Sequence, residues 1–277
     1  MTTGDISALT LRNSPHEWRV LAGGSGPVLL FLHGAGGSAE SFGGVLEALV
    51  GRFRVIAPDL PGHGGTRLGA KGRSGLSEMA TDVASLVSQQ FEAPLAIIGH
   101  SAGAAIALQL AHHLSPRGHF LINPALDPFV GVTGWAFPAL ARGLSVAPFS
   151  GDLLSGLFGK ERRITELLEA TGSVVTPEMK RRYLELAQNP QHIRGTLAMM
   201  AAWDVSRLRR RLHDFNSAIA VMIAEGDTTI KPAAMEAAAS QMKDATITKR
   251  AGGHLIHEEA PEVIAEDIAA FVSGLAD

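Results

Sequence analysis

Residues 95–114 read LAIIGHSAGAAIALQLAHHL, and no other stretch constrains the architecture of this chain as strongly. The apolar run at 95–98 predicts a strand buried on both faces, as the strands of parallel sheets are. The small residues that follow Ser101 predict a helix that begins directly behind it. Gly99 and Gly103 let strand and helix pass close together without a Cβ between them. The stretch therefore predicts a strand, a sharp turn and a helix, with a serine hydroxyl held at the turn.

The same alternation of apolar runs and helical stretches extends over most of the chain. Strands are predicted at residues 27–32, 54–57, 95–98, 120–122, 218–224 and 245–248. Helices are predicted, from 3.6-residue periodicity or alanine-rich composition, at residues 77–91, 104–114, 232–242 and 261–275. Strands that alternate with helices are typical of a doubly wound, mostly parallel sheet with helices on both faces. The expected fold class is therefore α/β.

One long segment interrupts this pattern. Residues 124–215 contain no strong strand, and we expect them to be helical. They hold 12 basic and 9 acidic residues, whereas the rest of the chain holds 12 basic and 18 acidic ones. Because composition and pattern change together, we interpret residues 1–123 and 216–277 as one α/β core. Residues 124–215 are then a helical cap inserted into that core.

The composition of the 277 residues excludes several classes of protein. Apolar residues make up 46% of the chain and charged residues 18%, which excludes a disordered protein. The formal net charge of −3 argues against nucleic-acid binding, which needs a basic surface to displace phosphate counterions. Because the chain has no cysteine, disulfides, thiolate catalysis and zinc–sulfur sites are excluded. Without a signal peptide or a transmembrane run of about 18 apolar residues, we expect a cytoplasmic protein.

The serine at the predicted turn needs partners before it can act as a nucleophile. A serine hydroxyl requires a base, and the base requires an acid that orients it. His254 is the preferred base, because it follows the last predicted strand in a glycine-rich loop that can reach over the edge of the sheet. Asp227 is the preferred acid, because it comes directly after the strand at 218–224. We therefore expect Ser101, Asp227 and His254 to form a catalytic group.

Competing residues remain open at this stage. His257 is the second candidate for the base, although its position at the start of a helix predicts an exposed side chain. Asp127 follows an earlier strand, and Glu225 lies close to the preferred acid, so both are alternative acids. The histidines at 112–113 fall in the helix behind the serine, and we expect them at the surface or in packing contacts.

Chemistry at an acyl group also needs two N–H donors for the negative charge that develops on oxygen. The N–H of Ala102 follows the serine directly, and the loop at 33–37, which reads HGAGG, offers the N–H of Ala35. A glycine-rich loop can also cradle phosphates, but the full dinucleotide-binding pattern is not met here. We therefore expect an oxyanion hole formed by Ala35 and Ala102, with no cofactor and no metal ion.

Taken together, these motifs resemble the α/β-hydrolase superfamily, and the resemblance covers nearly the whole chain. It rests on HGAGG at 33–37, DLPGHG at 59–64, GHSAG at 99–103, GD at 226–227 and GGH at 252–254. The resemblance implies an α/β-hydrolase fold with a triad of Ser101, Asp227 and His254, in the chain order of that superfamily. The loop after the acid departs mildly from the family pattern, because Lys231 precedes its proline.

The insert carries a second resemblance. Together with the core stretch GHSAGAAIALQLA at 99–111, it looks like the magnesium-chelatase accessory group of bacteriochlorophyll biosynthesis in photosynthetic bacteria. The other stretches that carry this resemblance are LINPALDPF at 121–129, LLEATGS at 167–173 and HIRGTLAMMAAWDVSRL at 192–208. This resemblance implies magnesium chelatase or a porphyrin intermediate as a partner. The arginines at 209–211 extend the expectation to a porphyrin carboxylate, or to an anionic membrane surface that would make the protein membrane-peripheral.

Two functions from different classes are compatible with these observations. The first is a serine hydrolase that cleaves an ester or related acyl bond of a hydrophobic small-molecule substrate bound under the cap. The second is a non-catalytic protein on the same fold that binds a tetrapyrrole or assists the chelatase. A haloperoxidase-like enzyme or a C–C hydrolase also remains open, whereas a dehalogenase is disfavoured because its nucleophile is an aspartate. The fold alone does not choose among these activities.

Overall fold

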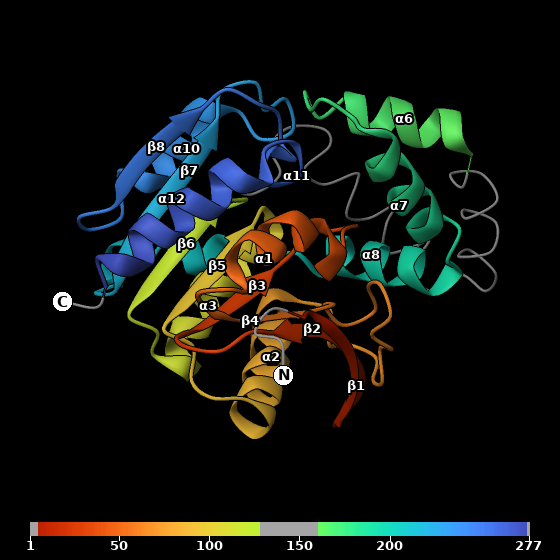
Figure 1. Cartoon of the computed structure of the whole chain (residues 1–277), viewed down its shortest axis with the longest axis horizontal. Coiled ribbons are helices and arrows are strands. Elements are labelled where there is room, and N and C mark those ends of the chain that lie inside the picture. The colour runs from red at the N-terminus through yellow and green to blue at the C-terminus, as the bar shows by residue number, and fades with distance from the viewer. Residues whose placement is uncertain (1–4, 128–159, 276–277) are drawn as a thin grey trace.

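The computed structural model describes residues 5–127 and 160–275. Its centre is one eight-stranded sheet with the strand order β1-β2-β4-β3-β5-β6-β7-β8 (Figure 1). The strands are β1 (Ser7–Asn13), β2 (His16–Gly23), β3 (Val28–Leu32), β4 (Arg54–Pro58), β5 (Ala96–His100), β6 (Gly118–Ile122), β7 (Ala218–Ala224) and β8 (Thr246–Arg250). Every strand predicted from an apolar run is present, so the predicted α/β fold class is confirmed.

The two N-terminal strands are absent from the sequence-based prediction. β1 pairs antiparallel with β2, and β2 pairs antiparallel with β4. Neither strand contains a continuous apolar run, because β1 is largely exposed and β2 buries only one of its faces along most of its length. The missed signal is the alternation around Trp18 and Val20, which are both buried and lie on the same face of β2.

The six strands from β3 to β8 run parallel to their neighbours. The register sets Leu32 opposite Gly99 and His100 opposite Ile122, so three neighbouring strands end at nearly the same level. In an open parallel sheet, ligands bind beyond the carboxyl ends of the strands. The loops after β3, β5, β7 and β8, which carry the residues singled out in the sequence, therefore meet at one edge of the sheet.

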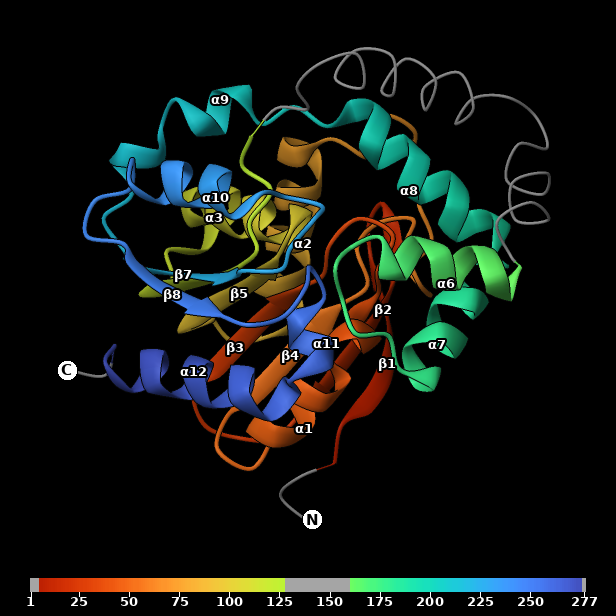
Figure 2. The ribbon, with the colours of Figure 1, turned by 90° about the horizontal axis from the view of Figure 1, so that it is seen from above.

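Helices cover both faces of this sheet, as Figure 2 shows from above. One face carries α1 (Gly43–Leu49) and α12 (Pro261–Ser273), and the other carries α2 (Leu76–Gln90), α3 (Ala102–Leu114) and α10 (Pro232–Ala239). Leu29 and Phe31 of β3 pack toward the first face, whereas Leu30 and Leu32 pack toward the second. This alternation explains why β3 has no polar residue. None of the helices in the described residues has the length and apolar character that a membrane span requires.

The predicted insert lies between β6 and β7. Its described part forms the helices α6 (Glu161–Glu169), α7 (Pro177–Ala187), α8 (Pro190–Ala202) and α9 (Ser206–Arg209). No strand occurs between residues 160 and 215, as the sequence predicts. Ile164, Leu168 and Met179 form a small apolar cluster with Leu255 of the core, which fixes α6 and α7 against it. Residues 128–159 lie outside the described part, so the boundaries of the cap at 124 and 215 remain a prediction.

Candidate active site

Ser101 lies at the turn between β5 and α3, where the sequence predicts it. Its backbone angles of φ 53° and ψ −117° are strained for a residue that has a side chain. A Cβ at position 99 would lie 2.5 Å from the Cα of Ala104, and a Cβ at position 103 would lie 2.1 Å from the carbonyl oxygen of Leu32. Only glycine fits at these two positions, and the close passage that it allows holds the serine in its strained turn.

Asp227 and His254, which follow β7 and β8, meet at the same edge of the sheet. The Nδ1 atom of His254 lies 2.6 Å from Oδ2 of Asp227, whose side chain is fully buried. A carboxylate accepts hydrogen bonds, so Nδ1 donates and the Nε2 atom of the neutral ring is left as an acceptor. This is the tautomer that a general base needs. The structure thus brings the predicted acid and the predicted base together.

The backbone of His254 is held by residues that the sequence analysis did not single out individually. Its carbonyl oxygen accepts a hydrogen bond of 2.9 Å from His100 Nε2 and one of 3.0 Å from Asn123 Nδ2. Its N–H donates to the carbonyl oxygen of Thr171 at 3.1 Å, and the next N–H donates to Ser173 Oγ at 2.9 Å. The only sequence signal for these roles is that all four residues stand in or beside motifs that carried a resemblance.

The structure corrects the expectation for His257. This residue lies near the start of α11 (Ile256–Glu259), but it is only 1% exposed and is not a surface histidine. Its ring packs between those of His100 and Phe42, with centroids 4.2 and 4.8 Å away. Burial lowers its pKa to about 3, and among the described residues neither ring nitrogen has a hydrogen-bond partner. His257 also does not line the cavity that Ser101 lines, so its position does not favour a role as the base.

Among the described residues, neither alternative acid is hydrogen-bonded to His254. Asp127 forms an ion pair with Arg209, and Glu225 is exposed at the end of β7. Within residues 5–127 and 160–275, the carboxylate bonded to His254 is that of Asp227. The histidines at 112–113 are exposed on α3, as expected.

The glycine-rich loop after β3 forms a tight turn with Ala35 at its tip. Gly37 N–H donates to the carbonyl oxygen of Gly34 at 3.1 Å, and His33 Nδ1 donates to the same oxygen at 2.8 Å. The other ring nitrogen of His33 accepts a hydrogen bond of 2.9 Å from Leu60 N–H, and burial lowers the pKa of this ring. Ala35 and the predicted second donor, Ala102, both line the same cavity as Ser101.

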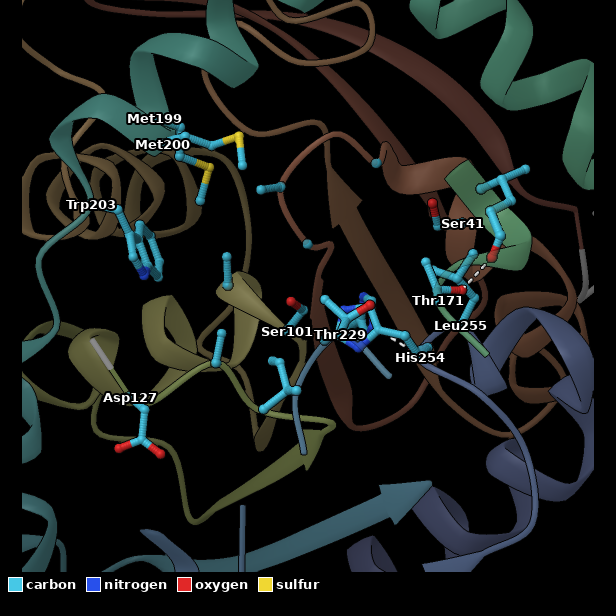
Figure 3. A pocket seen from close by; sticks show the side chains of 18 of the residues that line it. Ser41, Ser101, Asp127, Thr171, Met199, Met200, Trp203, Thr229, His254 and Leu255 are labelled. Carbon is cyan, nitrogen blue, oxygen red and sulfur yellow. Dashed lines mark hydrogen bonds between the residues drawn. The ribbon is translucent and has the colours of Figure 1, made fainter. Parts of the chain in front are cut away.

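Loops of the core and helices of the insert enclose a cavity of about 440 Å³. Figure 3 shows Ser101 and His254 in the middle of this cavity, with Trp203, Met199 and Met200 on one side. Ser41, Thr171 and Leu255 lie on the other side. The walls are mostly apolar, as in sites that bind hydrophobic small molecules. Among the described residues, no group of three or more His, Asp or Glu side chains is placed to hold a metal ion.

Among the described residues, few cations line this cavity. Arg209 is paired with Asp127, and Arg211 is paired with Asp214 at 3.0 Å, so neither arginine offers the free basic rim suggested by the sequence. Lys231, at the start of α10, lines the cavity and has no ion pair within the described part of the chain. The residue that departs from the family pattern is therefore an exposed cation that lines the cavity.

Comparison with known proteins agrees with this architecture. Residues 29–267 match the model of the alpha/beta hydrolase family. The chain belongs to the alpha/beta hydrolase family. Within this family it is 41% identical over 270 residues to the magnesium-chelatase 30 kDa subunit of Rhodobacter capsulatus, a match that covers 97% of this chain and 95% of that protein. Both resemblances stated from the sequence motifs, to the superfamily and to the chelatase-associated group, are thereby confirmed.

Other members of the family share parts of the sequence or only the fold. A pimeloyl-[acyl-carrier protein] methyl ester esterase from Aeromonas hydrophila is 33% identical over 151 residues, which cover 54% of this chain and 56% of that enzyme. A thermophilic esterase from Thermogutta terrifontis superposes with a TM-score of 0.76 over 98% of this chain and 99% of that one. The two sequences are 21% identical, so this likeness concerns the alpha/beta hydrolase fold alone.

Proposed function

We propose that this member of the alpha/beta hydrolase family is a serine hydrolase that cleaves an ester or related acyl bond of a hydrophobic substrate. One observation carries the proposal. His254, bonded at 2.6 Å to the buried Asp227, lines the same cavity as Ser101 in its strained turn. This is the combination of nucleophile, oriented base and acid that acyl transfer requires.

In the proposed reaction, Ser101 Oγ attacks the acyl carbon while its proton passes to Nε2 of His254. Asp227 stabilises the resulting imidazolium, and the N–H groups of Ala35 and Ala102 stabilise the negative charge on the former carbonyl oxygen. The bond to the leaving alcohol then breaks, and the alcohol takes the proton from His254. Water attacks the acyl-enzyme by the same route, which releases the acid and restores Ser101.

The cavity also supports a proposal for the substrate class. Met199, Met200 and Trp203 form a wall suited to a large apolar or ring-shaped group. Lys231, an exposed cation that lines the cavity, suits a carboxylate on the same molecule. We therefore propose an amphipathic substrate, an ester with a hydrophobic body and a second, anionic carboxylate, as a porphyrin intermediate with acidic side chains would be.

Labelling with a fluorophosphonate tests the nucleophile. This reagent phosphonylates an activated serine, so wild-type protein should be labelled and Ser101→Ala should not be. Mass spectrometry should place the adduct on Ser101, and heat-denatured wild type, the control, should remain unlabelled because activation depends on the folded site. No label on the folded wild type, or an adduct on another serine, would contradict the proposal.

A second function is favoured by one specific observation, the 41% identity to a magnesium-chelatase subunit. In this alternative, the protein assists the chelatase or binds its porphyrin without turnover. Magnesium insertion by the chelatase should be measured with wild type and with Ser101→Ala. Equal stimulation by the two proteins would favour the assisting role, whereas loss of stimulation in Ser101→Ala would tie the chelatase to the proposed hydrolysis.

A further inference from the structure

The segment HIRG at 192–195, which the sequence analysis singled out, lies outside the proposed chemistry but touches its loops. Helix α8 begins at Pro190, and the side chain of Asn189 caps it by accepting hydrogen bonds from the N–H groups of Gln191 and His192. These two hydrogen bonds at the N-terminus fix where the helix begins. They turn His192 inward, where the residue is only 2% exposed.

The two ring nitrogens of His192 join two different loops of the core. Gly64 N–H donates to Nδ1 at 3.0 Å, and Nε2 lies 3.2 Å from the carbonyl oxygen of Gly36. A carbonyl oxygen accepts hydrogen bonds, so Nε2 carries the hydrogen and Nδ1 is the bare acceptor. One neutral tautomer therefore satisfies both contacts. Burial lowers the pKa of His192 to about 4, which keeps the ring neutral near pH 7.

The contact with Gly36 continues along the loop to Ala35. The carbonyl of Gly36 shares a planar peptide unit with the N–H of Gly37, and this N–H donates to the carbonyl oxygen of Gly34. The carbonyl of Gly34 in turn shares a peptide unit with the N–H of Ala35. Among the described residues, no backbone acceptor takes the Ala35 N–H, which is the proposed oxyanion donor. His192 thus begins a chain of two peptide units that ends at this donor.

Such a chain acts in two ways. Each peptide is planar, so a hydrogen bond to its carbonyl also sets the direction of its N–H. Hydrogen bonds in series polarise one another, so the last N–H becomes a better donor. Gly36 has φ +75°, and the nearest atom to a Cβ built there is 3.7 Å away, on Thr196 of α8 itself. The peptide between Gly36 and Gly37 is therefore held by two hydrogen bonds, one from His192 to its carbonyl oxygen and one from its N–H to Gly34.

The helix is seated firmly enough to provide that restraint. Gly195 lies against the loop after β4 so closely that a Cβ would stand 2.1 Å from the carbonyl oxygen of Gly62. Gln191 Nε2 also donates to the carbonyl oxygen of Thr66 at 3.1 Å. The first two turns of α8 are therefore docked on the core backbone by contacts that do not involve the oxyanion loop.

We propose that His192 is a positioning residue, through which the cap sets the direction and the donor strength of the Ala35 N–H. The proposal rests on the proposed serine hydrolase function. It makes the inserted helix α8 part of the oxyanion hole, although no atom of α8 donates to the oxyanion. Removing one oxyanion donor costs roughly 10²–10³ in kcat in enzymes of this kind, so a misdirected donor should cost about 10- to 100-fold.

Two substitutions separate the contacts of His192. In His192→Asn, the amide oxygen stands near the position of Nδ1, so the bond from Gly64 is kept and the bond to Gly36 is lost. In His192→Gln, the amide nitrogen reaches the position of Nε2, so the bond to Gly36 is kept and the bond from Gly64 is lost. Each variant loses one buried hydrogen bond and the same ring packing, so both should lose similar thermal stability.

The proposal predicts that only the first variant is impaired. With a neutral aryl ester, kcat should fall about 10- to 100-fold in His192→Asn with KM within about twofold, whereas His192→Gln should stay within about threefold of wild type. The amide nitrogen and proton resonances of Ala35 should shift in His192→Asn and not in His192→Gln, also on a Ser101→Ala background. Equal losses of kcat in both variants, or unchanged Ala35 resonances in His192→Asn, would overturn the proposal. An inactive wild type would instead count against the proposed hydrolase function. The Ala35 resonances would still test whether His192 acts on the Ala35 N–H through the two peptide units.

Discussion

At the scale of single residues, Asp227 divides its two oxygens between two tasks. Oδ1 accepts hydrogen bonds from the N–H groups of Thr229 and Ile230 at 2.7 and 2.9 Å, which closes the loop after β7. Oδ2 accepts from His254 Nδ1. A change that spares Oδ1 and alters only Oδ2 therefore separates the charge of the acid from the structure of its loop.

Asp227→Asn is such a change. The amide oxygen can still accept from the loop, but the amide NH₂ then faces Nδ1 of His254 and stabilises the tautomer with hydrogen on Nε2. This tautomer cannot take a proton from Ser101, so kcat on an aryl ester should fall by about 10³- to 10⁴-fold, with little change in KM. The exposed neighbour Glu225 offers the matched control, and Glu225→Gln should stay within about twofold of wild type. If kcat of Asp227→Asn falls less than tenfold, Asp227 is not the acid of the proposed mechanism.

Lys231 carries the proposed preference for an anionic substrate. In Lys231→Gln, kcat/KM for an ester with a free carboxylate should fall by about three- to tenfold, because an exposed charge is partly screened by water and salt. The value for a neutral ester of equal length should not change. Lys249→Gln is the control, since Lys249 is paired with Glu236 at 2.8 Å and does not line the cavity. The proposed anionic substrate would be abandoned if both esters responded equally to Lys231→Gln.

At the scale of elements, α7 of the insert is joined to α11 of the core through one buried carboxylate. Glu258 forms an ion pair with Arg182 and accepts a hydrogen bond of 2.7 Å from Tyr183 Oη. Its side chain is 1% exposed, and burial raises its pKa. Because α11 begins two residues after His254, this contact holds the insert against the segment that carries the proposed base.

Glu258→Gln should therefore destabilise the protein strongly. It leaves the largely buried Arg182 without its counter-charge, and breaking one side of such a pair costs about 3–5 kcal/mol, less here because the guanidinium keeps some exposure. We expect a loss of about 2–4 kcal/mol in the free energy of unfolding, measured by urea denaturation. On α7, the control Glu185→Gln breaks an exposed pair with Arg181 and should cost only about 0.5 kcal/mol. Similar losses in the two variants would show that the contact between α7 and α11 contributes little to stability.

At the scale of the whole molecule, most of the histidines are buried. Eight of the eleven are buried, and burial lowers the pKa of six of these, to about 4 for His119 and His192 and about 3 for His257. In the unfolded chain each histidine regains a pKa near 6.5. Below that pH the unfolded state binds protons that the folded state does not. The buried histidines therefore do not reduce the free energy of unfolding above about pH 6.5. They reduce it increasingly as the pH falls from 6.5 toward their pKa values in the folded state.

We expect the free energy of unfolding to fall steeply between pH 6.5 and 5. Each such histidine contributes about 1.4 kcal/mol per pH unit once the unfolded state is fully protonated. His119→Gln should therefore make the slope shallower by about one proton, whatever its effect on stability at neutral pH. Urea denaturation at several pH values measures the slope, with the exposed His113→Gln as the control. An unchanged slope in His119→Gln would show that His119 takes up its proton in the folded state as well.

The sequence by itself determined the parallel part of the sheet, the serine turn and the family. These features depend on local patterns, since an apolar run and two glycines around Ser101 specify strand, turn and helix without reference to distant residues. The N-terminal hairpin of β1 and β2 was not predicted, because burial of one face leaves an alternating pattern of apolar residues instead of a continuous apolar run. Asp227 and His254 could be proposed from their positions after strands, but their catalytic roles stay predictions.

Only the tertiary structure decided which polar side chains meet. His257 looked like a surface residue because burial at the start of a short helix depends on Phe42 and His100, which come from distant segments. The hydrogen bond from His192 to Gly36 joins residues 156 positions apart, and no local sequence pattern predicts it. Local periodicity fixes the type of an element, whereas the partner of a buried polar group is fixed by whichever chain segments the folded core brings within hydrogen-bond distance.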